Sequence, residues 1–173
     1  MRNGIIKTVI APALVFGFLA MPPAHAATEL FAAQLSGDQE VPPIFTAATG
    51  VFTMDIQTGG AAPVITFTLS FADLSAPLAA SHLHFAPPGV AGGVMIFLCG
   101  GGGQPACPAA TAGTVTGTLS AANVVGPAAQ GITAGNFDAV LDIIREGIAY
   151  ANMHDASFPA GEARGQVQRG YRP

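Results

Sequence analysis

The chain has 173 residues, of which 50% are hydrophobic and 9% are charged, and its formal net charge at pH 7 is −4. This length is sufficient for one domain with a substantial hydrophobic core. Because an acidic surface repels phosphate backbones and anionic lipids, the composition argues against binding to nucleic acid or to a membrane surface.

The beginning of the chain has the pattern of a secretory signal peptide. Arg2 and Lys7 precede an apolar run from Val9 to Ala20, and a small-x-small cleavage signal closes the segment. The apolar run is shorter than a comfortable membrane span, and no second run follows it. We therefore predict that residues 1–26 are removed and that residues 27–173 form a single exported domain, periplasmic or extracellular, without a membrane span.

Short runs of β-branched and aromatic residues, separated by turn residues, occupy most of the chain after this leader. Eight such runs without strand–helix alternation are typical of an all-β, antiparallel sandwich or flattened barrel. The expected strands are residues 30–35, 50–56, 64–71, 80–85, 93–98, 114–119, 148–154 and 163–168.

One segment departs from the strand pattern and predicts a short helix near residues 134–146. Thr133 is a candidate N-cap, and Gly147 is suited to end the helix. We expect this helix to close one end or edge of the sandwich. The apolar residues at helical spacing are Phe137, Val140, Leu141 and Ile144.

Cys99 and Cys107 bracket a short glycine-rich stretch. In an exported protein, two cysteines eight positions apart are most simply joined in a disulfide. The alternative is a thiolate metal or redox pair, but the spacing is not Cys-x-x-Cys and an oxidising compartment disfavours free thiols. We predict a structural disulfide.

Three of the four histidines lie in two short motifs on expected strands. His82 and His84 are two positions apart, so they share one face of their strand. By the same alternation, His154 shares the polar face of its strand with Tyr150 and Asn152. If the two strands are neighbours, the three imidazoles lie in one polar patch.

Such a patch has two interpretations. Two imidazoles at positions i and i+2 can bind one ion, and a third would complete a three-histidine site for copper or zinc with an open position. Binding would require neutral imidazoles and should weaken as the pH falls through about 6.5. Alternatively, His82, His84 and His154 hydrogen-bond to loop backbones and stack with Tyr150, which would order the sheet edge without any ion.

Further polar residues are expected around the histidines. Arg164 belongs to the polar face of the last expected strand. Glu40, Asp155 and Glu162 are its candidate partners, and we predict ion pairing rather than acid–base chemistry for these carboxylates.

Five motifs, in this order, resemble the CHRD domain, which is named after chordin and also occurs in bacterial secreted proteins. The resemblance covers residues 30–168. It implies an immunoglobulin-like β-sandwich, distantly similar to copper/zinc superoxide dismutases, and brings no established biochemical activity. The motifs are Leu35-Ser-Gly-Asp-Gln-Glu-Val-Pro-Pro43, Ser81-His-Leu-His84, Gly92-Gly-Val-Met-Ile-Phe-Leu98, Gly147-Ile-Ala-Tyr-Ala-Asn-Met-His154 and Phe158-Pro-Ala-Gly-Glu-Ala-Arg-Gly-Gln166.

The similarity to the dismutases extends to single residues. That family places His-x-His on a strand, a further copper histidine late in the chain and an arginine near the C-terminus, which His82, His84, His154 and Arg164 resemble. Its copper, however, has four imidazoles, one of which bridges to a zinc site built from more histidines and an aspartate. Three histidines remain after the leader, so a complete dismutase site cannot be assembled.

The sequence thus favours a binding or structural module over an enzyme. It has no Gly-x-Ser-x-Gly elbow, P-loop or dinucleotide fingerprint. A mononuclear copper or zinc protein with a redox or metal-buffering role is the alternative function, and a cell-surface adhesion domain is the third. The expected partner is a protein or small ligand of unknown identity.

Overall fold

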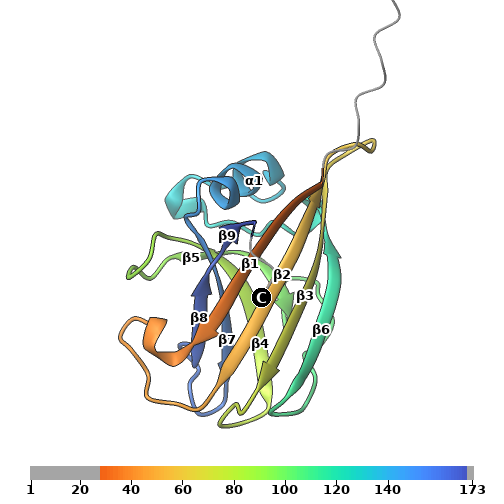
Figure 1. Ribbon diagram of the computed structural model, residues 1–173. Helices are drawn as coiled ribbons and strands as arrows, with labels where there is room; N and C mark the ends of the chain where they lie inside the picture. The colour runs from red at the N-terminus through yellow and green to blue at the C-terminus, as the bar shows by residue number, and fades with distance from the viewer. Residues whose placement is uncertain (1–27, 171–173) are drawn as a thin grey trace, which may run out of the picture.

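The computed structural model describes residues 28–170 (Figure 1). The predicted signal peptide lies outside the described residues. All eight expected strand regions are strands, and the last one is divided in two. The strands are β1 (Thr28–Ser36), β2 (Thr49–Gln57), β3 (Val64–Ala72), β4 (Leu78–Phe85), β5 (Gly93–Cys99), β6 (Gly113–Leu119), β7 (Ala149–Asp155), β8 (Ala163–Gln166) and β9 (Gln168–Arg169).

The strands form one antiparallel sheet with the order β5-β4-β7-β8-β1-β2-β3-β6, and β9 pairs with β1 beside this path. The sheet curves back on itself, so that β1, β2 and β3 pass in front of β4 and β7 in Figure 1. A bridge between Ile96 and Val124 joins β5 to the segment that follows β6. The fold is therefore a nearly closed antiparallel barrel or flattened sandwich, and the predicted all-β class is confirmed.

The interior of this barrel is apolar because the strands alternate as the sequence predicts. Along β2 and β3, every second side chain is buried, including Phe52, Ile56 and Leu69. On the opposite layer, Leu83 of β4 and Met153 of β7 are fully buried in the same core. The outward residues of β4 and β7 are consequently the polar ones.

The predicted short helix is confirmed as α1 (Phe137–Arg145), which covers the upper end of the barrel in Figure 1. Thr133 is not its N-cap: the Thr133 carbonyl accepts a hydrogen bond from the Asn136 amide in a preceding turn. The N-cap is Asn136, whose side chain accepts a hydrogen bond from the Ala139 amide at 3.2 Å. Gly147 ends the helix as predicted, with a φ of 71° and an amide that donates to the Ile144 carbonyl.

The division of the last expected strand has a local cause. Val167 is buried and donates its amide to the Ala149 carbonyl, whereas the residues after it pair with β1. Two residues earlier, Gly165 lies so close to β1 that a Cβ there would be 2.1 Å from the Gln34 carbonyl oxygen. The last expected strand therefore changes its pairing partner from β7 to β1 next to Gly165, a position where only glycine fits.

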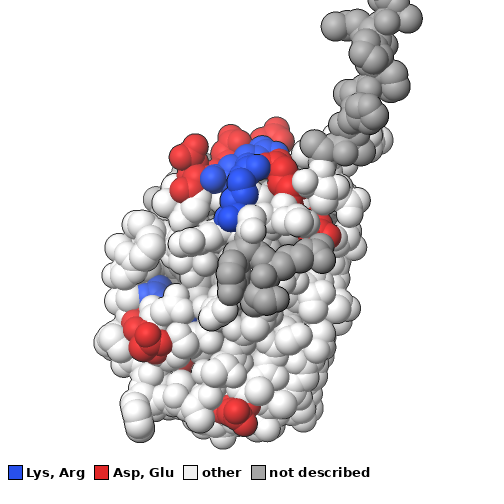
Figure 2. All heavy atoms as spheres, viewed as in Figure 1, with Lys and Arg blue, Asp and Glu red and all other residues white. Residues whose placement is uncertain are grey.

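Charged side chains are scarce on the face shown in Figure 2, and several gather at the end that carries α1. There the Glu29 carboxylate binds Arg145 at 2.7 Å and also pairs with Arg169, which links β1, α1 and β9. The predicted disulfide between Cys99 and Cys107 is also confirmed, with 5.0 Å between the Cα atoms. Among the described residues, no helix is long and apolar enough to cross a membrane.

Candidate metal centre

The sheet order places the three histidines on one polar face. β4 and β7 are neighbours, with His82 opposite Asn152 and His84 opposite Tyr150. His154 lies opposite Ala80, so it is two positions further along the same face. On the other side of β7, Arg164 of β8 lies opposite Asn152. The polar sets of three strands thus form one continuous patch.

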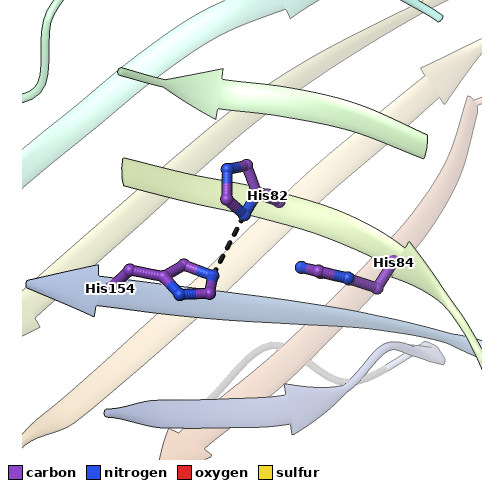
Figure 3. A group of neighbouring side chains, drawn as sticks. All are labelled: His82, His84 and His154. Carbon is purple, nitrogen blue, oxygen red and sulfur yellow. Dashed lines mark hydrogen bonds between the residues drawn. The ribbon is translucent and has the colours of Figure 1, made fainter. Parts of the chain in front are cut away.

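The three imidazoles point toward one another, as Figure 3 shows. Nδ1 of His82 lies 3.0 Å from Nε2 of His154. Each of the three rings offers one nitrogen, and these nitrogens all lie within 4.8 Å of one another. We call His82, His84 and His154 the histidine cluster.

Backbone carbonyls fix the tautomers of two of the rings. Nδ1 of His84 lies 3.0 Å from the Gly92 carbonyl oxygen, and Nδ1 of His154 lies 3.1 Å from the Pro159 carbonyl oxygen. Because a carbonyl can only accept, each Nδ1 carries the proton and each Nε2 has a free lone pair. Nε2 of His154 then accepts from Nδ1 of His82.

Two lone pairs of the histidine cluster have no hydrogen-bond donor. Nε2 of His84 and Nε2 of His82 are both buried without a partner. An unpaired buried acceptor costs free energy, which a cation bound by Nε2 of His84, or an ordered water, would recover. The donor set therefore fits a metal ion that prefers imidazole nitrogen.

The surroundings keep the imidazoles neutral. Burial, with smaller contributions from the neighbouring His154 and His84 rings, lowers the pKa of His82 to about 3. Burial also lowers the pKa of His84 to about 4, against the opposing effect of the Gly92 hydrogen bond. The pKa of His154 is lowered for the same main reason. Protonation of these three imidazoles therefore requires a lower pH than the value of about 6.5 that is ordinary for histidine.

Aromatic side chains form the walls around the histidine cluster. The Tyr150 ring stacks on His84 with 4.6 Å between centroids and an interplanar angle of 5°. The Arg164 guanidinium lies over the same Tyr150 ring at 4.7 Å. On the other side, Phe97 of β5 contacts His82 edge to face, with centroids 4.4 Å apart.

Arg164 has one of its three candidate partners. Its Nε lies 3.6 Å from Oε2 of Glu40, and both side chains are buried. Asn152 supports this pair by donating to Oε1 of Glu40 at 2.7 Å. Burial raises the pKa of Glu40 despite the opposing charge of Arg164.

Asp155 and Glu162 do not pair with Arg164 but bind the connection between β3 and β4. The Asp155 carboxylate accepts hydrogen bonds from the Ala76 amide at 2.6 Å and the Phe158 amide at 2.7 Å. Glu162, fully buried, accepts from the amide and hydroxyl of Ser75 and from another hydroxyl, that of Thr46. Ion pairing was the wrong role for these two carboxylates, because backbone amides and hydroxyls reach them instead.

Sequence reasoning did not identify Phe97 or the two carbonyls that fix the tautomers. Phe97 occurs in an apolar run, so nothing distinguishes it from a core residue until the pairing of β4 with β5 is known. The Gly92 and Pro159 carbonyls belong to loops, and their positions depend on the loop paths. Gly92 and Gly93, at the start of β5, were the one available sign of a tight approach.

A family model described as CHRD domain matches residues 31–167. The matched region contains all three members of the histidine cluster and the Glu40–Arg164 pair. Comparisons with curated proteins and with solved structures gave no match.

Proposed function

The chain belongs to the CHRD domain family, and we propose that it is an exported binding module whose histidine cluster holds one Cu(II) or Zn(II) ion. One observation carries this proposal. Three imidazoles each bring one nitrogen into a group within 4.8 Å, and Nε2 of His84 is buried there without a hydrogen-bond partner.

The chemistry of the donors supports copper or zinc. Imidazole suits both ions, and the general order of affinities favours Cu(II) over Zn(II). The 3.0 Å between Nδ1 of His82 and Nε2 of His154 is compatible with two ligands that each lie about 2.0–2.1 Å from one ion. A bound ion would replace the hydrogen bond between these two nitrogens, and the His82 ring would then carry its proton on Nε2. The Gly92 and Pro159 carbonyls hold the outer N–H groups, which is the usual arrangement behind metal-binding histidines.

Three protein ligands would leave a coordination position open, and a bound ion would supply Lewis acidity or, for copper, redox chemistry at that position. All three histidines of the described residues belong to the cluster, which leaves no further histidine for the second metal site of a dismutase, so we propose metal buffering or ligand binding rather than dismutation. Export fits the predicted leader, residues 1–26, and the Cys99–Cys107 disulfide, which belongs to oxidising compartments.

A metal-free binding or adhesion module is the second candidate function. The observation that favours it is the hydrogen bond between His82 and His154, which partly satisfies the histidine cluster without an ion. In this case the exposed residues around the cluster would bind a partner protein, and the imidazoles would only order the strands.

Metal titration of the purified, metal-free protein separates the two candidates. We expect one equivalent of Cu(II) to bind, with Zn(II) weaker, when affinity is measured by competition with a chelator. His82→Ala, His84→Ala and His154→Ala should each weaken binding by more than about tenfold. Gln34→Ala, an exposed change on β1, is the control and should leave the affinity unchanged. Substoichiometric binding by the wild type, or equal affinity in all variants, would favour the metal-free module.

A further inference from the structure

We propose that Phe97, held in place by the loop between Cys99 and Cys107, is a positioning residue that aims the His82 ring at His154. This inference deepens the proposed function, on which its metal readout rests. It assigns a role at the site to a disulfide loop whose contact with the histidine cluster runs through the Phe97 ring.

The three rings of the histidine cluster are not held in the same way. His84 and His154 each donate an N–H to a backbone carbonyl, which fixes the ring orientation. His82 has no such anchor: its Nδ1 bonds to His154 itself, and its Nε2 is buried without a partner. The orientation of His82 must therefore depend on packing.

Phe97 supplies that packing. It pairs with His82 across β5 and β4, and its ring meets the imidazole at 86° with centroids 4.4 Å apart. Figure 3 shows His82 extending from β4 while its lower nitrogen faces His154. An aromatic ring at this distance blocks rotation of the imidazole away from His154 and keeps water from that side.

The glycine-rich loop in turn covers Phe97. A Cβ at Gly101 would lie 2.5 Å from Cε1 of the Phe97 ring, and a Cβ at Gly102 would lie 2.5 Å from Cδ2. The loop is kept compact by the disulfide and by a hydrogen bond from the Gly100 amide to the Pro105 carbonyl at 2.9 Å. The glycines thus allow the loop backbone to lie directly against the ring.

The described contacts form a continuous series from the disulfide through the loop and Phe97 to His82. A side chain at Gly101 should displace the Phe97 ring, and this displacement should change the orientation of His82. Gly101 has no positive φ, so Gly101→Ala perturbs the ring without backbone strain. The loop therefore controls how well the site is preorganised, which for residues behind metal ligands is typically worth about 10- to 100-fold in affinity.

A matched glycine elsewhere in the barrel provides the control. Gly117 on β6 lies against Phe67 of β3 in the same manner, since a Cβ at Gly117 would lie 2.7 Å from Cε1 of the Phe67 ring, and Gly117 also lacks a positive φ. Gly117→Ala should therefore disturb a phenylalanine ring to a similar extent, but at a strand pair that carries no histidine.

The experiment compares Phe97→Ala, Gly101→Ala and Gly117→Ala with the wild type. Imidazole ¹⁵N NMR of the metal-free proteins reports the tautomer and hydrogen bond of each histidine. We expect the His82 resonances to shift in the first two variants while those of His84 and His154 stay in place. Cu(II) affinity should fall about 10- to 100-fold in both, with a changed Cu(II) EPR spectrum, and Phe97→Tyr should restore both. Gly117→Ala should leave the NMR and the affinity unchanged.

The two proposals fail in different ways. His82 resonances that remain as in the wild type in both Phe97→Ala and Gly101→Ala would overturn the positioning role, whatever the metal binding. If the wild type binds neither Cu(II) nor Zn(II), the proposed function fails, and the NMR of the metal-free protein still decides the role of Phe97. Should Phe97→Ala not fold, the comparison of Gly101→Ala with Gly117→Ala gives the same decision.

Discussion

Arg164 and Glu40 form a buried ion pair, with Nε of Arg164 3.6 Å from Oε2 of Glu40. The pair joins β8 to the segment after β1, and Arg164 also donates to the carbonyls of Gln39 and Val90. One guanidinium of the polar patch thus connects two loops and also lies over the Tyr150 ring.

Removal of this guanidinium should destabilise the protein. Arg164→Ala leaves the Glu40 carboxylate buried and unpaired, which we expect to cost about 3 kcal/mol of the free energy of unfolding. Urea denaturation measures this difference. Arg169→Ala is the control, because Arg169 also pairs with a glutamate but its side chain is 57% exposed, and it should cost less than about 1 kcal/mol. Equal midpoints for Arg164→Ala and the wild type would refute a structural role.

Stability should decrease as the pH falls below about 6.5, the ordinary value of histidine, in part because of His82. The folded state holds the pKa of His82 at about 3, so the unfolded chain binds a proton that the folded chain excludes. The free energy of unfolding therefore decreases by about 1.4 kcal/mol per pH unit for this group across that window. Denaturation of metal-free protein at several pH values measures the slope. His82→Gln should show a flatter slope, and parallel slopes would count against the lowered pKa.

The buried Glu162 carboxylate should stabilise the connection between β3 and β4. Glu162→Gln places an amide group among donors that need an acceptor, so we expect a loss of about 2–3 kcal/mol in the free energy of unfolding. Hydrogen exchange of the Ser75 amide, which donates to Glu162, should also become faster. Glu146→Gln is an exposed control that should change stability by less than about 0.5 kcal/mol. A similar small change in both variants would contradict the prediction.

The disulfide should restrain the unfolded chain modestly because its loop is short. Alkylation of Cys99 and Cys107 should require prior reduction of the native protein. Replacement of both by serine should cost about 2–3 kcal/mol on the chain-entropy estimate. Thermal denaturation monitored by circular dichroism tests this, and a substantially larger loss would mean that the loop contributes more than its closure.

The sequence predicted the fold and the face of each histidine because both depend on local alternation. His82 and His84 are two positions apart on a strand, so they must share a face whatever the rest of the chain does. The start of α1 was less accessible. Thr133 and Asn136 are both good N-caps, and the choice between them depends on the turn that the Thr133 carbonyl makes.

Partner choice among buried polar groups could not be predicted in the same way. Glu162 adjoins the strand that carries Arg164, yet its carboxylate is directed to Ser75 and Thr46, which lie far away in the sequence. Such pairings depend on how loops cross the ends of the barrel. The same holds for the carbonyls that fix the His84 and His154 tautomers.

The position of β8 has a consequence for the order of assembly during synthesis. In the described sheet, β8 lies between β7 and β1 and joins the group β5-β4-β7 to the group β1-β2-β3-β6. A ribosome completes β8 after every strand of both groups, so a nascent chain that ends before Ala163 lacks the strand that joins them, and only the Ile96–Val124 bridge links the two groups at their other edges. The histidines on the outer face of β4 and β7 can meet earlier, but the barrel closes only when the last strands have been made.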